Sequence, residues 1–68
     1  MKIINNVIRH SVVETIYESQ LLPLKIRKLF DSITNINWIY IIPSSGVEYA
    51  ITEECADDII KSMSEEKI

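Results

Sequence analysis

The stretch Ile36–Ile60 reads INWIYIIPSSGVEYAITEECADDII, and it predicts a strand, a tight loop, a second strand and a helix. Residues 37 to 42 are aromatic and β-branched, which suits a pleated surface. Pro43 cannot donate to a hydrogen-bond ladder, so the first strand should end there. Gly46 is the only glycine in the chain and should supply a positive φ angle at the end of the loop. We expect the rest of the chain to pack against this unit.

If residues 43 to 46 form the loop, the returning strand runs from Val47 to Ile51 and pairs with the first strand. The resulting cross-strand pairs are Ile42 with Val47, Tyr40 with Tyr49 and Trp38 with Ile51. We expect this Trp38 face to be core. The opposite face carries Ile39 and Ile41, and a strand that is apolar on both sides is usually covered on both sides. Because two strands alone are marginal in water, another segment or a second chain should complete the sheet.

Residues 53 to 64 predict the best-marked helix. Thr52 is a favourable N-cap, and Glu53 and Glu54 then lie in the first turn, where the helix dipole favours negative charge. One apolar stripe follows the i, i+3, i+4, i+7 rule and comprises Ala56, Ile59, Ile60 and Met63. Residues 64 to 68 are expected to fray.

The N-terminal half is ambiguous. Apolar doublets recur four residues apart at Ile3–Ile4 and Val7–Ile8 and continue at Val12–Val13 and Ile16–Tyr17, which favours a helix. Ser11 and Glu14 form a capping-box pattern that would instead start a helix at Val12 and leave residues 2 to 9 free to be a strand. The pattern alone leaves both alternatives open.

A second helix is predicted over residues 23 to 33. Pro23 suits a first helical turn, and one side of the segment would be apolar. The apolar positions at helical spacing are Leu22, Ile26, Leu29, Phe30 and Ile33. The predicted fold class is therefore a small α+β domain of order α-α-β-β-α, over residues 1 to 68.

Composition indicates a chain with more apolar surface than it can bury. A chain of 68 residues buries only about 60% of its unfolded surface, yet 47% of its residues are hydrophobic. A homo-oligomer or a partner interface would take the surplus. The single cysteine excludes an internal disulfide and suits the cytoplasm. No apolar run approaches the ~20 residues of a membrane span, and the N-terminus lacks a signal-peptide pattern.

Charge is unevenly distributed along the chain. The net charge is −3, but residues 1 to 46 carry +2 and residues 47 to 68 carry −5. A solvated helix face explains the acidic residues, and an acidic patch that docks on a basic partner surface is the sharper alternative. The candidate partner-binding residues are Glu53, Glu54, Asp57, Asp58, Ile39 and Ile41.

Little in the sequence supports catalysis. His10 is the only histidine, and Cys55 is the only cysteine, surrounded by carboxylates that disfavour a thiolate. One His and one Cys cannot make a zinc site, and one glycine cannot make a phosphate-binding loop. We therefore expect no enzyme, no cofactor and no metal.

Nucleic-acid binding is the alternative that the sequence keeps open. Lys25, Arg27 and Lys28 form a basic cluster on the predicted helix over residues 23 to 33. A helix followed by a β-hairpin resembles part of a winged-helix domain, with residues 43 to 46 as the wing tip. That loop carries no Lys or Arg to neutralise phosphates, which weighs against it.

The leading hypothesis is a small, non-enzymatic regulator or inhibitor that occludes a partner protein and self-associates. Compact acidic proteins of this size are common among phage and mobile-element gene products, which suggests such a source. The alternative is a winged-helix-like transcriptional regulator.

Overall fold

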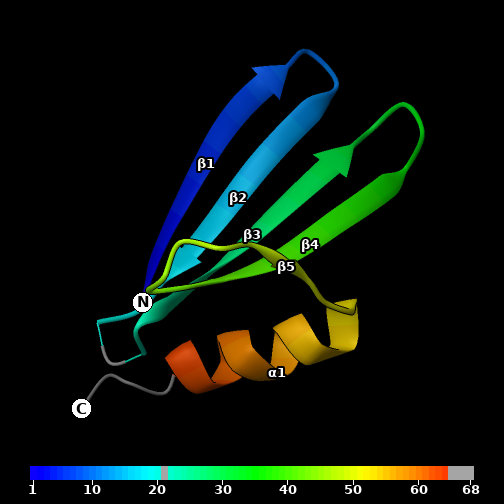
Figure 1. The fold of residues 1–68 in the computed structure, drawn as a ribbon. Coiled ribbons are helices and arrows are strands. Elements are labelled where there is room, and N and C mark those ends of the chain that lie inside the picture. The colour runs from blue at the N-terminus through cyan, green and yellow to red at the C-terminus, as the bar shows by residue number, and fades with distance from the viewer. Residues whose placement is uncertain (21, 65–68) are drawn as a thin grey trace.

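The sheet is built from consecutive strands, and a helix follows it. The computed structural model describes residues 1–20 and 22–64, and within them five antiparallel strands precede one helix (Figure 1). The elements are β1 (Lys2–Arg9), β2 (Val12–Glu18), β3 (Leu24–Asp31), β4 (Ile36–Pro43), β5 (Tyr49–Ala50) and α1 (Glu53–Ser64). Each strand pairs with the next, so the order in the sheet is β1-β2-β3-β4-β5.

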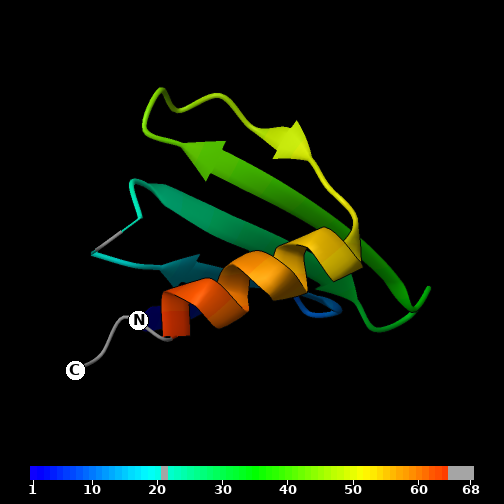
Figure 2. The ribbon, with the colours of Figure 1, turned by 90° about the horizontal axis from the view of Figure 1, so that it is seen from below.

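The helix covers one face of this sheet. Figure 2 shows α1 running across that face, and in Figure 1 the β1–β2 and β3–β4 turns project beyond the helix. The buried core comprises Ile26 of β3, Ile39 of β4, and Ala56 and Met63 of α1. Ile59 and Ile60 pack against it, so the predicted apolar stripe of the helix is confirmed.

The start of α1 is as its sequence predicts. The Cys55 backbone N–H donates to Thr52 Oγ1 at 3.1 Å, which is the N-cap hydrogen bond. Glu53 and Glu54 occupy the first turn. The helix covers Glu53–Ser64. Fraying was expected over residues 64 to 68, of which residues 65 to 68 lie outside the described part of the chain.

The predicted order α-α-β-β-α is wrong, because the segments assigned to N-terminal helices are strands. The alternative of a strand over residues 2 to 9 is confirmed by β1, but Val12 begins β2 rather than a helix. Apolar doublets caused the error. In a strand, adjacent residues point to opposite faces, so each doublet supplies one apolar side chain to each face of the sheet. The spacing of the doublets merely resembles a helical period.

The predicted helix over residues 23 to 33 is also wrong, because Leu24–Asp31 is the central strand β3. Leu24 and Ile26 alternate with Lys25 and Arg27, which is a strand pattern that the helical spacing obscured. Ile26 is fully buried between β2 and β4, where it pairs with Tyr17 and Ile41. Pairing on both sides therefore overrode local helix propensity here.

The hairpin of β4 and β5 exists, but its register differs by one residue from the prediction. Tyr40 pairs with Ala50 and Ile41 with Tyr49, and the Ile51 N–H donates to the Ile39 carbonyl at 3.0 Å. Gly46 has the predicted positive φ, 89°, and its N–H donates to the Pro43 carbonyl. A slip of one residue exchanges the two faces of a strand. Ile51 therefore packs into the core instead of facing Trp38.

The assignment of the two hairpin faces was consequently wrong. Ile39 is only 8% exposed and Ile41 packs against the core, so both lie under α1 instead of on a free surface. Trp38, expected in the core, is 41% exposed on the opposite face. The helix could lie on either side of β4, since both sides are apolar, and it covers the Ile39 side.

Candidate functional site

The helix packs on one face of the sheet and leaves the opposite face uncovered. Residues that alternate with the core positions Ile26 and Ile39 point to it. We call this surface the open face. Its central positions, brought side by side by the strand register, are Ile4, Val12, Glu14, Ile16, Lys25, Arg27, Leu29, Trp38, Tyr40 and Ile42.

A charged cluster lies at the centre of the open face. Arg27 donates from Nε to Glu14 Oε2 at 2.6 Å and from a terminal nitrogen to Glu48 Oε1 at 2.9 Å. Asn6 Nδ2 donates to the other oxygen of Glu14 at 3.0 Å. The guanidinium is thus shared between two carboxylates from β2 and from the loop before β5. Its charge is neutralised inside the molecule, so it is poorly suited to bind an external phosphate.

These contacts shift the ionisation of the cluster. The Arg27 hydrogen bond, reinforced by the one from Asn6, lowers the pKa of Glu14 against the opposing effect of burial. The same hydrogen bond from Glu14 raises the pKa of Arg27. Glu14 and Arg27 therefore remain charged and paired at neutral pH, with side chains 12% and 27% exposed.

Apolar and aromatic side chains surround the charged cluster. Trp38 lies beside Leu29 and Tyr40 lies beside Arg27 in the register of β3 and β4. A shallow hollow of about 340 Å³ opens here, lined by Ile8, Arg9, Val12, Arg27, Leu29, Asp31, Trp38 and Tyr40. Trp, Tyr and Arg are the residue types that contribute most to protein–protein affinity. The open face therefore combines typical anchor residues with an internally balanced charge.

A second hollow extends the apolar surface at the other end of the sheet. It has a volume of about 450 Å³ and is formed by the ends of β2 and β4 and the start of β3. Ile16 and Ile42 of the open face contribute to it, together with Leu22 and Pro23. Lys25 at its rim forms an ion pair with Glu18 at 3.6 Å.

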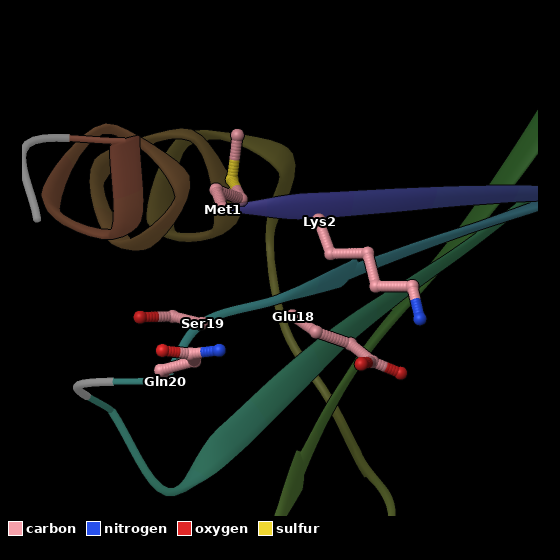
Figure 3. A pocket seen from close by; sticks show the side chains of 5 residues that line it. All are labelled: Met1, Lys2, Glu18, Ser19 and Gln20. Carbon is pink, nitrogen blue, oxygen red and sulfur yellow. The ribbon is translucent and has the colours of Figure 1, made fainter. Parts of the chain in front are cut away.

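A third hollow, of about 460 Å³, is polar and lies where β1 begins and β2 ends (Figure 3). Met1, Lys2, Glu18, Ser19 and Gln20 line it. Ser19 Oγ accepts the Leu22 N–H at 3.4 Å, so the hydroxyl has a structural partner.

The described residues 1–20 and 22–64 contain no cluster of three or more His, Cys, Asp or Glu side chains that could hold a metal ion. His10 lies in the exposed turn after β1, and Cys55 lies exposed in the first turn of α1. Over the same part of the chain, no helix has the length and apolar character needed to cross a membrane.

The acidic residues predicted to bind a partner are all exposed on α1. They are Glu53, Glu54, Asp57 and Asp58. Asp57 forms an ion pair with Lys28 of β3, whose Nζ lies 3.7 Å from Asp57 Oδ1, and this pair links the helix to the sheet. Their role in partner binding stays a prediction. Ile39 and Ile41, predicted to act with them, are packed beneath the helix instead.

The basic cluster proposed for nucleic acid is divided between the two faces. Lys25 and Arg27 point to the open face, where both form ion pairs with glutamates. Lys28 points to the helix side, near Asp57 and 5.8 Å from the Tyr17 ring centroid. The helix that would have carried them as one patch is a strand, so the winged-helix resemblance loses its structural basis.

The sequence-based prediction missed the Glu14–Arg27–Glu48 cluster. The signal was present in residues 12 to 18, where Glu14 alternates with apolar Val12 and Ile16. A strand reading would have placed a carboxylate within an apolar face, where it needs a cationic partner. The helix reading instead placed it in a capping box.

Comparison with known proteins finds no matching protein family, no matching curated protein and no matching solved structure.

Proposed function

We propose that this chain is a non-enzymatic, cytoplasmic regulator or inhibitor that occludes a partner protein by docking its open face. The observation that carries the proposal is the exposed Trp38, beside Leu29 and Tyr40, on the face of the sheet that α1 leaves uncovered. Burying such aromatic and apolar side chains against a partner is the main source of affinity in protein interfaces. The mechanism is steric occlusion and needs no catalytic group.

The charge pattern of the open face supports a protein partner. Arg27 and Lys25 are already paired with glutamates, so little net positive charge remains to attract a phosphate backbone. The four exposed carboxylates of α1 lie away from the open face and contribute a negative field. Such a field accelerates encounter with a basic partner and weakens as salt is added.

A capture experiment with matched variants tests the proposal. The wild-type chain, Trp38→Ala and Ile33→Ala are used as baits, and each captured protein is identified and purified. Ile33 is an ideal control because it is 71% exposed but lies in the turn between β3 and β4, off the open face. Trp38→Ala should weaken binding of the purified partner by roughly 30-fold, and Ile33→Ala should leave it unchanged.

The intrinsic fluorescence of the chain supplies an independent readout. Trp38 is the only tryptophan, so its emission reports the open face alone. Docking of the purified partner should shift this emission to shorter wavelength as the indole leaves water. A partner that binds Trp38→Ala as tightly as wild type, with no shift in the wild-type emission, would refute the proposal.

A further inference from the structure

The strands at the two edges of the sheet differ in length. At one edge, β5 contains only two residues, which limits what can pair with it. At the other, β1 is eight residues long, and an edge strand presents a row of unpaired backbone N–H and C=O groups. Lys2 and Arg9 mark its ends, but Ile3–Ile8 contains neither a charge nor a proline that would discourage pairing.

Exposed apolar side chains accompany this edge on the helix side of the sheet. Val7 is paired with Val13, and Val13 with Phe30, so the three form one row across β1, β2 and β3. Their exposures are 73%, 38% and 37%, because the row lies toward the turns that project beyond α1. Ile3, on the same side of β1, is 51% exposed. A partner at this edge could therefore bury both ends of the strand.

We propose that β1 pairs antiparallel with β1 of a second copy of the chain, about a two-fold axis at Asn5. Facing residues of an antiparallel pair point to the same side of the sheet. A symmetric pair must therefore have its axis at a residue, here Asn5 or Asn6, rather than between them. The register of β1 shifts between Val7 and Arg9, so the regular part of the strand ends at Val7. Pairing about Asn6 would bring Ile8, at the register shift, opposite Ile4, whereas pairing about Asn5 uses regular residues from Ile3 to Val7.

This register is self-complementary. Ile3 of each copy faces Val7 of the other on the helix side, and Asn5 faces Asn5. The exposed row of Phe30, Val13 and Val7 then continues into Ile3 of the second copy, whose neighbour Tyr17 packs against the core. Continuity of an apolar row across the axis favours a second copy over an unrelated strand, because the chain itself supplies both halves.

Engineered cysteines test the register. In a Cys55→Ser background, two Asn5→Cys residues would face each other with Cβ atoms about 4.5–5.5 Å apart, and mild oxidation should link them into a disulfide dimer. Asn6→Cys is the matched control, since its two copies would lie about 8 Å apart and should link no faster than Ile33→Cys in a remote turn. Equal or faster linking through Asn6→Cys would overturn the proposal.

Light scattering on the unmodified chain tests whether the dimer forms. The fraction of dimer should increase with protein concentration. Val7→Lys places a charge opposite Ile3 at both ends of the interface and should weaken the dimer about tenfold, whereas Val47→Lys should not. Because Val7 is 73% exposed, the variant should keep its fold, which circular dichroism checks. A chain that remains monomeric at millimolar concentration would overturn the proposal.

The inference is independent of the proposed function. Trp38 lies on β4, three strands from β1 and therefore about 14 Å away. Trp38→Ala should leave the dimer intact, and the Trp38 emission should not change on dimerisation. A concentration-dependent shift in that emission would instead locate self-association on the open face and contradict edge pairing.

Discussion

Trp38 and Ile39 are adjacent in β4 but lie on faces with different roles. Ile39 is 8% exposed beneath α1, whereas Trp38 is 41% exposed on the open face. Both faces are rich in apolar residues, so composition does not distinguish them. The difference arises from α1, which packs mainly on β4 and covers one side. Stability should therefore depend on the covered face, and recognition on the open face.

The largest effect should come from Ile26, which is fully buried on the central strand. Ile26→Ala removes packing and leaves a cavity, which should lower the free energy of unfolding by about 2–5 kcal/mol. A domain of this size has a total of only about 3–10 kcal/mol, so the variant can unfold at room temperature. Urea denaturation measures the loss.

Two related variants keep the Ile26 prediction open to refutation. Ile26→Val should fold and lose about 0.5–1.5 kcal/mol. Leu29→Ala, three residues along β3 on the open face, should cost less than Ile26→Ala, because Leu29 is only partly buried. Equal losses for Ile26→Ala and Leu29→Ala would mean that both faces are covered in solution, and the contrast between them would be lost.

The next effect concerns the attachment of α1 to its face. Thr52→Ala removes the acceptor of the Cys55 N–H and should cost about 0.5–2 kcal/mol. Thr34→Ala, in the exposed turn before β4, is the matched control and should be nearly neutral. Thermal unfolding followed by circular dichroism compares them. If the two variants are equally stable, the cap contributes nothing to covering the sheet.

The contrast between α1 and the N-terminal strands shows which parts of the fold the sequence could predict. The helix is marked by local signals, Thr52 at its start and the stripe ending at Met63, and these agree with its packing. β4 is similarly marked by its aromatic and β-branched residues. Local signals suffice where they all indicate the same element.

β1, β2 and β3 could not be assigned in this way because their apolar doublets fit two periods. Long-range pairing decided the outcome, since Ile26 is buried only when Tyr17 and Ile41 flank it. The same limit applies to the candidate site. Trp38 and Ile39 were recognised as apolar on opposite sides, but only the position of α1 determines which side is covered. The Arg27 cluster joins residues from β2, β3 and the loop before β5, so it could not be found before the strand order was known.

A smaller effect on the free energy of unfolding should come from the charged cluster of the open face. Glu14→Gln weakens the pairing with Arg27 and should cost on the order of 1 kcal/mol at neutral pH. Because the folded pKa of Glu14 lies below its ordinary value of 4.5, the stabilisation is complete above about pH 4.5 and is lost as the pH falls through the folded pKa.

Free energies of unfolding, measured from neutral pH to below pH 4.5, test whether the Glu14–Arg27 pair stabilises the fold. The wild-type chain should lose stability more steeply than Glu14→Gln below pH 4.5. Glu18→Gln is the control, since it leaves the Glu14–Arg27 pair intact and should therefore keep the steep loss of stability seen for the wild-type chain. Parallel profiles for wild type and Glu14→Gln would show that the cluster is not formed.

The smallest stability effect should come from Trp38, although it is the largest side chain removed. Trp38→Ala loses a cross-strand contact with Leu29 but opens no cavity, so it should cost only about 0.2–1 kcal/mol. Urea denaturation against Ile39→Ala, the adjacent residue on the covered face, gives the sharpest test, because Ile39→Ala should cost about 2–5 kcal/mol. A Trp38→Ala loss equal to that of Ile39→Ala would place Trp38 in a second core and leave the open face without its principal anchor for a partner.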